Sequence, residues 1–273
     1  MSGVILALVE HPETAPRTLA AARNLAGLMG NARINVLAIR TPPESTIIAT
    51  EEVLTRHQAA DIRAREQARV AGLQAAFDAW APVARTPGVA IEWTDIEGPA
   101  EIVVGEWGRR SDFIVLHRPA RRDSAADRLA LQAALFDTDR PVLVVPPGPG
   151  AAFGERVAVA WRDDDKRTIR ALISAMRVFG NARQVHVLAG VRAGAPAPEL
   201  PAILTEHGVA ATLHVLPVGT GVFGAAVLTA AHGLGADVLV MGAYTHSAWR
   251  ELLLGGVTRH MLANADLPVL MRH

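Results

Sequence analysis

Two glycine-rich stretches in the second half of the chain have spacings that could bind phosphate. The first, GTGVFG, places Gly219, Gly221 and Gly224 in a G-x-G-x-x-G pattern between a strand-like run and a helical run. In dinucleotide-binding folds this pattern follows the first strand of the unit, and an acidic residue follows a later strand. Here the pattern follows the third strand-like run of its half. No acidic residue follows a second strand at the distance that a dinucleotide site requires. We therefore interpret it as a tight turn, with an NAD site as the less favoured alternative.

The second stretch lies near the C-terminus, where Gly242 ends an apolar run and Gly255 and Gly256 precede a helical run. A glycine at the carboxyl end of a strand lets the backbone approach a ligand closely. Free N–H groups at the start of a helix bind anions. Together these features predict a phosphate cradle; the alternative is that the glycines only permit two tight turns.

The rest of the sequence offers little for catalysis or for metal binding. It contains no cysteine and no G-x-S-x-G, H-E-x-x-H or P-loop lysine motif, and its ten histidines show no ligand spacing. The carboxylates of Asp163–Asp165 could hold magnesium beside a phosphate, but helix capping is the preferred interpretation. We assign no catalytic residue and no protein metal site.

The composition excludes several classes of partner. Lys plus Arg and Asp plus Glu both number 27, so no net charge attracts nucleic acid or an anionic membrane. The longest apolar run, Val222–Ala231, is too short to span a bilayer, and the N-terminus lacks the pattern of a signal peptide. These features predict a cytoplasmic protein that binds neither nucleic acid nor membrane.

Both halves of the chain show the same order of apolar and helical runs, and several phrases recur in register. GNAR begins at residues 30 and 180, SDFIVLH matches ADVLVMG, and DTDRPVLVVP matches NADLPVLMRH. We infer a duplicated α/β unit, with domains at residues 1–148 and 154–273 and a seam in the Pro- and Gly-rich stretch Pro146–Glu155. Strands that alternate with helices predict, in each domain, a doubly wound parallel sheet with helices on both faces.

These features resemble the universal stress protein family, in particular its tandem two-domain members, over the whole chain. The family's nucleotide-binding members carry Gly, two residues, Gly, nine residues, then Gly and Ser or Thr. That pattern falls on Gly242, Thr245, Gly255 and Gly256, so the second and fourth positions depart from it, although the hydroxyl of Thr258 lies close in the sequence. The equivalent stretch of the first half contains no glycine. The resemblance thus implies a partial site in the second domain and a degenerate one in the first.

The resemblance also implies a fold, a function and partners. Each domain should have a mostly parallel five-stranded sheet of order 3-2-1-4-5, and the two fifth strands should meet within the chain as a pseudo-dimer, with a homodimer as a further option. The family's ATP-binding members place an acidic residue after strand one, where this chain has Glu10 in the first half and Arg162 in the second. We predict a stress-response module that binds ATP or another adenine nucleotide weakly, with or without magnesium, and assign no turnover. A slow nucleotide hydrolase and a purely structural interaction protein are the alternatives.

Overall fold

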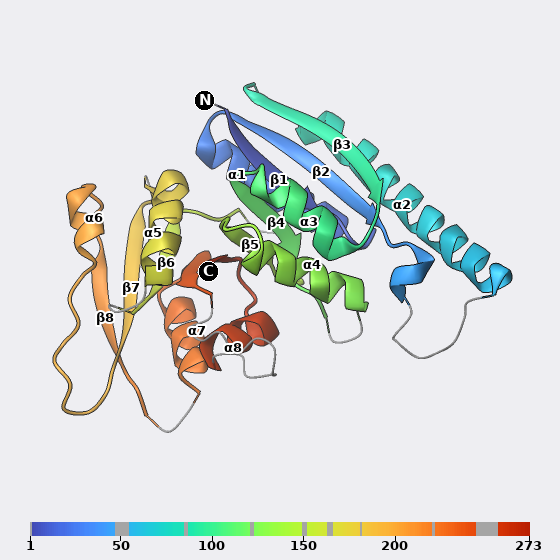
Figure 1. The fold of residues 1–273 in the computed structure, drawn as a ribbon. Helices are drawn as coiled ribbons and strands as arrows, with labels where there is room; N and C mark the ends of the chain where they lie inside the picture. The colour runs from blue at the N-terminus through green and yellow to red at the C-terminus, as the bar shows by residue number, and fades with distance from the viewer. Residues whose placement is uncertain are drawn as a thin grey trace. The chain divides into compact units, whose positions relative to one another are not determined.

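The computed structural model describes most of the chain, namely residues 2–46, 55–84, 87–120, 123–148, 152–162, 166–180, 182–219, 222–243 and 256–273 (Figure 1). The chain forms two compact units, Met1–Arg140 and Pro141–His273. Each unit is an α/β structure in which buried strands alternate with helices.

The first unit has a parallel sheet in the order β3-β2-β1-β4. Its elements are β1 (Gly3–Leu8), α1 (Ala15–Met29), β2 (Ala32–Arg40), η1 (Pro43–Thr46), α2 (Arg56–Ala84), β3 (Val89–Glu97), α3 (Ala100–Arg109), β4 (Phe113–His117) and α4 (Ala125–Phe136). The central strand β1 pairs on both sides, with Ile5 opposite Ile34 and Phe113. Continuous apolar runs form β1 and β4 because helices cover both faces of the sheet. Figure 1 shows α1 and α2 on one face and α3 and α4 on the other.

The second unit repeats this order with a parallel sheet β8-β7-β6-β9-β10. Its elements are β5 (Val142–Val145), β6 (Arg156–Trp161), α5 (Lys166–Phe179), β7 (Gln184–Val191), α6 (Ala202–Glu206), β8 (Thr212–Pro217), α7 (Phe223–Gly233), β9 (Val238–Gly242), α8 (Gly256–Asn264) and β10 (Val269–Arg272). Strand β5 pairs antiparallel with β10, with Leu143 opposite Leu270. The two strands that the family resemblance predicted to meet, β5 and β10, therefore lie side by side.

The predicted α/β fold is confirmed. The second unit has the full order 3-2-1-4-5, and the strands of the first unit reproduce its first four positions. Strand β5 belongs to the second compact unit because it pairs with β10, whereas the seam inferred from the sequence follows β5. The domain limits 1–148 and 154–273 stay a prediction.

An aspartate holds the start of the central strand in each unit. Asp112 accepts a hydrogen bond from the backbone N–H of Val4 at 2.8 Å, and its own N–H donates to the carbonyl of Val4 at 2.7 Å. Asp237 does the same for the second unit, accepting from the N–H groups of residues 154, 155 and 156 at 2.8, 3.1 and 2.9 Å. These two residues are the aspartates of SDFIVLH and ADVLVMG, so this repeated phrase has a structural cause.

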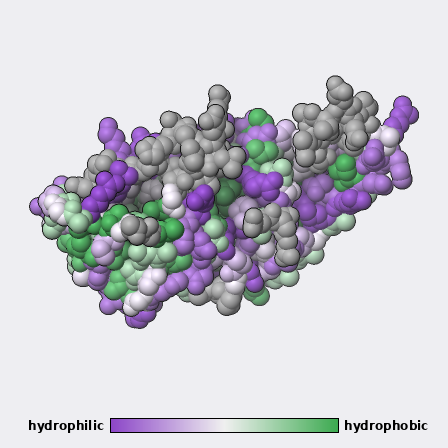
Figure 2. All heavy atoms as spheres, turned by 90° about the horizontal axis from the view of Figure 1, so that it is seen from below, coloured by the Kyte–Doolittle hydropathy of each residue, from purple (hydrophilic) through white to green (hydrophobic). Residues whose placement is uncertain are grey.

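Helix α2 differs from its neighbours in being largely hydrophilic. Among its described side chains only Val70, Leu73 and Ala84 are buried. Hydrophilic residues, drawn in purple, are widespread on the face that Figure 2 shows. Among the described residues, no helix combines the length and the apolar character needed to cross a membrane.

Candidate functional site

The strand registers place Glu10 and Arg162 at equivalent positions in the two units. Ile5 lies opposite Phe113 in the first unit, and Val157 lies opposite Val238 in the second. Counting forward from these pairs, Glu10 and Arg162 both follow the central strand, near the ends of β4 and β9. In open α/β sheets this is where the strand order reverses and where ligands bind.

In the second unit, the described residues of the predicted site include Gly242, Arg162 and Gly256. Gly242 ends β9 and is half-buried, and Arg162 follows β6 and is exposed. Gly256 begins α8 and is exposed, and a Cβ added there would meet no atom of the described residues within 4 Å. The first turn of α8 contains no acidic residue. The described part of α8 thus begins with an exposed glycine and without an acidic side chain that would compete with an anion.

The other predicted site residues are either buried or outside the described residues. Thr258 is in α8 but only 4% exposed, so its hydroxyl is less accessible than the backbone at the helix start. Thr245 and Gly255 lie outside the described residues, as do Asp163–Asp165. Their roles in binding stay predictions.

The third glycine of GTGVFG has a packing role. Gly224 lies in α7, and a Cβ added there would be 2.7 Å from the Cβ of His260 in α8. The pattern also follows β8, the edge strand, which is separated from β6 by β7. Gly221 lies outside the described residues. The glycine at 224 is explained by the close approach of two helices without any ligand.

We expect Gly224→Ala to lower the free energy of unfolding by about 1–3 kcal/mol, because the added methyl overpacks the α7–α8 contact. Urea unfolding measures this. Gly233→Ala is the matched control: it is in the same helix with no atom within 4 Å of its Cβ, and alanine there should be neutral or stabilising. Equal effects of the two substitutions would contradict the packing role of Gly224.

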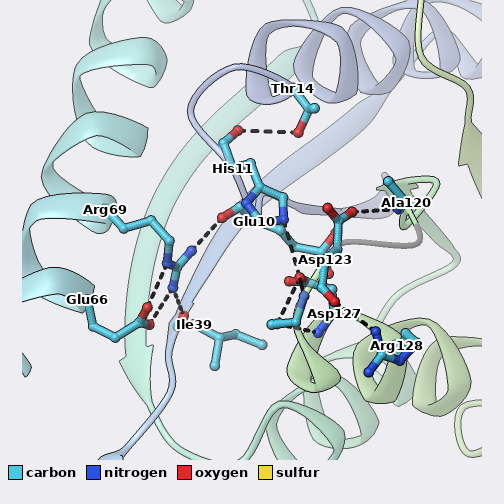
Figure 3. Close-up of polar contacts among 11 residues, drawn as sticks. Glu10, His11, Thr14, Ile39, Glu66, Arg69, Ala120, Asp123, Asp127 and Arg128 are labelled. Atoms are coloured by element: carbon cyan, nitrogen blue, oxygen red, sulfur yellow. Dashed lines mark hydrogen bonds and ion pairs between the residues drawn. The ribbon is translucent and has the colours of Figure 1, made fainter. Parts of the chain in front are cut away.

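The first unit holds a cavity of about 110 Å³, lined by apolar and polar side chains, at the equivalent position. It lies beside the ends of β1 and β2 and the start of α4, and Figure 3 shows its polar side chains. Its polar lining consists of Glu10, His11, Thr41, Glu66, Arg69, Ser124 and Asp127.

A capping box closes the start of α4 to anions. The Ser124 hydroxyl accepts a hydrogen bond from the N–H of Asp127 at 3.1 Å, and the Asp127 carboxylate accepts from the N–H of Ser124 at 2.7 Å. A carboxylate thus stands where an anion would bind the helix. Register also places His117 at the position that Gly242 has in the second unit. The first unit therefore opposes a phosphate at this position, whereas the first turn of α8 in the second unit carries no acidic residue.

Arg69 ties α2 to the ends of β1 and β2. Its guanidinium donates to the carbonyls of Glu10 and Ile39 and pairs with Glu66 at 2.8 Å (Figure 3). Glu66 also accepts the N–H of Thr41 at 2.9 Å. Burial raises the pKa of Glu66, but hydrogen bonds from Arg69 and Thr41 outweigh it and leave that pKa below its ordinary value.

Four titratable groups meet on the other side of the cavity. His11 Nε2 lies 3.3 Å from a carboxylate oxygen of Asp127, which raises the pKa of His11. Burial raises the pKa of Asp127, but hydrogen bonds from His11 and Ser124 hold it below its ordinary value. Glu10 is 9% exposed, and burial, followed by the charges of Asp127 and Asp123, raises its pKa well above its ordinary value.

Sequence reasoning missed this cluster. Its members come from three segments, near residues 10, 66–69 and 123–127, that no motif connects. The only local signals were the acidic residue after the first strand and the S-x-x-D capping pattern at Ser124. The sequence also has a basic cluster, Arg118, Arg121 and Arg122, interpreted as a solvated loop in preference to an anion site; Arg121 and Arg122 lie outside the described residues.

Comparison with known proteins gives one family and a set of related folds. The sequence model described as the universal stress protein family matches residues 115–273, more than half of the chain. No curated protein matches the sequence significantly.

Three solved structures resemble the whole chain. A universal stress protein from Archaeoglobus fulgidus superimposes with a TM-score of 0.68 at 17% identity, covering 100% of this chain and 96% of that one. A Pseudomonas aeruginosa protein named as a universal stress protein gives 0.62 at 16% identity, covering 98% and 92%. A second P. aeruginosa protein, of unknown function, gives 0.57 at 15% identity, also covering 98% and 92%. At these identities the likeness concerns the fold alone.

Proposed function

Because the chain belongs to the universal stress protein family, we propose that it is a binding and signalling module of the stress response that holds ATP or another adenine nucleotide in its second unit. The observation that carries this proposal is the start of α8, where Gly256 is exposed, the first turn has no acidic residue, and an added Cβ would meet no atom of the described residues within 4 Å. Backbone N–H groups there would bind the phosphates, with Gly242 allowing close approach and Arg162 adding positive charge.

Binding should be weak. An arginine stands at the position where the family's ATP-binding members place an acidic residue, and the buried Thr258 is a poor substitute for an exposed hydroxyl. Loss of one such hydrogen bond costs about 0.5–3 kcal/mol, which weakens binding by up to roughly two powers of ten. The first unit adds no second site in this proposal, because its helix start is capped by Asp127.

Gly256→Asp is expected to weaken ATP binding by at least about tenfold, because the new carboxylate occupies the helix start and repels phosphate. The fold should persist, since the added Cβ meets no atom within 4 Å. Titration calorimetry with ATP measures the affinity. Gly27→Asp is the matched control: it adds the same charge at an exposed glycine of α1 with an equally open Cβ.

The outcomes separate the three candidate functions. Binding that Gly256→Asp abolishes and Gly27→Asp preserves supports the nucleotide module, and equal affinity in both variants contradicts it. Release of phosphate from ATP would instead favour the slow hydrolase, and absence of any binding the interaction protein. For the module we also propose a cytoplasmic location, an internal pseudo-dimer through β5 and β10, and a homodimer as the form to test by light scattering.

A further inference from the structure

Three carboxyl groups and one imidazole lie close together at the edge of the first unit's cavity. The carboxyl groups of Glu10, Asp123 and Asp127 come together at the end of β1 and the start of α4 (Figure 3). The Arg69 guanidinium is already bound to Glu66 and to two backbone carbonyls. Among the described residues, His11 is the basic group in direct contact with these acids. One imidazole nitrogen and two aspartate carboxylates form a donor set that a cation can complete.

The donor atoms are close enough to share one ion. Nε2 of His11 and one carboxylate oxygen each of Asp123 and Asp127 all lie within 4.8 Å of one another. Ligands about 2.0–2.2 Å from a zinc ion lie roughly 3–3.5 Å apart, so a small inward rotation of these side chains would complete the set. The contacts of the Asp127 carboxylate with described residues use Oδ2, which leaves Oδ1 for an ion.

Glu10 provides a second and independent indication of a ligand. Its side chain is 9% exposed and lines the cavity together with His11 and Asp127. Its Oε1 atom is buried and has no hydrogen-bond partner among the described residues. An unpartnered buried carboxyl oxygen is costly and is one sign of an ion that completes the site.

We propose that His11, Asp123 and Asp127, with Glu10 beside them, bind a divalent transition-metal ion. One imidazole nitrogen and several carboxylate oxygens suit ions of the Zn²⁺ type, whereas Mg²⁺ prefers oxygen ligands and its own waters. This site is in the first unit and does not depend on the nucleotide site proposed for the second.

Titration of the full chain with Zn²⁺ alone, after treatment with a chelator and without nucleotide, tests the proposal. Calorimetry should show one tightly bound ion, and His11→Gln and Asp123→Asn should each weaken its binding by at least about tenfold. His232→Gln is the matched control, because His232 also contacts an aspartate, Asp266, but in a pair whose side chains are both exposed. Its zinc affinity should equal that of the wild type.

Thermal unfolding with and without Zn²⁺ compares each variant with itself, so a variant that is less stable than the wild type can still be tested for zinc binding. Zn²⁺ should raise the unfolding temperature of the wild type, and this rise should shrink in His11→Gln and Glu10→Gln while both variants stay folded without zinc. A rise of the same size in all variants, or an effect of His232→Gln equal to that of His11→Gln, would overturn the proposal.

Discussion

Asp237→Ala should lower the free energy of unfolding of the second unit by about 2–4 kcal/mol. The carboxylate accepts hydrogen bonds from three consecutive backbone N–H groups at the start of β6, and alanine leaves all three without a partner. Bonds to a charged acceptor are worth more than neutral ones, and partial access to water limits the loss. Urea unfolding measures the change, and hydrogen exchange should show faster exchange at the amides of residues 154–156.

The matched control for this substitution is Asp266→Ala. Asp266 is also in the second unit, but its side chain is 68% exposed and its partner is the ring of His232. Exposed pairs of this kind contribute about 0–1 kcal/mol. If both alanine variants lost the same stability, the anchoring role assigned to Asp237 would be wrong, and so would the structural account of the repeated aspartate.

Arg69→Ala should lower the free energy of unfolding of the first unit by about 2–4 kcal/mol. The substitution leaves Glu66, whose side chain is 21% exposed, without its cation, and it removes the donor shared by the carbonyls of Glu10 and Ile39. Arg63→Ala is the control in the same helix, because Arg63 pairs with Glu44 where both side chains are more than half exposed. That exposed pair should contribute less than about 1 kcal/mol.

Replacing both Arg69 and Glu66 shows whether Arg69→Ala destabilises the unit by leaving an unpaired buried carboxylate or by removing the other contacts of the arginine side chain. Arg69→Met combined with Glu66→Leu should cost less than Arg69→Ala, because no unpaired carboxylate is left behind. A double variant as unstable as the single one would show that the guanidinium acts mainly through its bonds to the two strand ends. In the wild type, the lowered pKa of Glu66 means that its contribution is present above its ordinary pKa and is lost as the pH falls through the folded value.

Local patterns were enough to predict the architecture. Buried runs such as Ile5–Leu8 and Val238–Met241 are continuous and apolar because helices cover both faces, and this pattern can be recognised without knowing their partners. The repeated SDFIVLH and ADVLVMG phrases indicated the duplication, and the structure adds the reason for their aspartates. The strand order required the family resemblance, since alternation of strands and helices alone does not determine it.

The sequence by itself thus determined the α/β class, and it indicated a repeated unit and the glycines at 242 and 256 that make a phosphate site worth testing. Only the tertiary structure brought Glu10 and His11 to Asp123 and Asp127 and placed Arg69, 59 residues from Glu10 along the chain, against its carbonyl. Short-range spacing reports which face of a strand or helix is buried. Which side chains meet at the end of a sheet depends on strand register and helix packing between distant segments, and no local pattern records these.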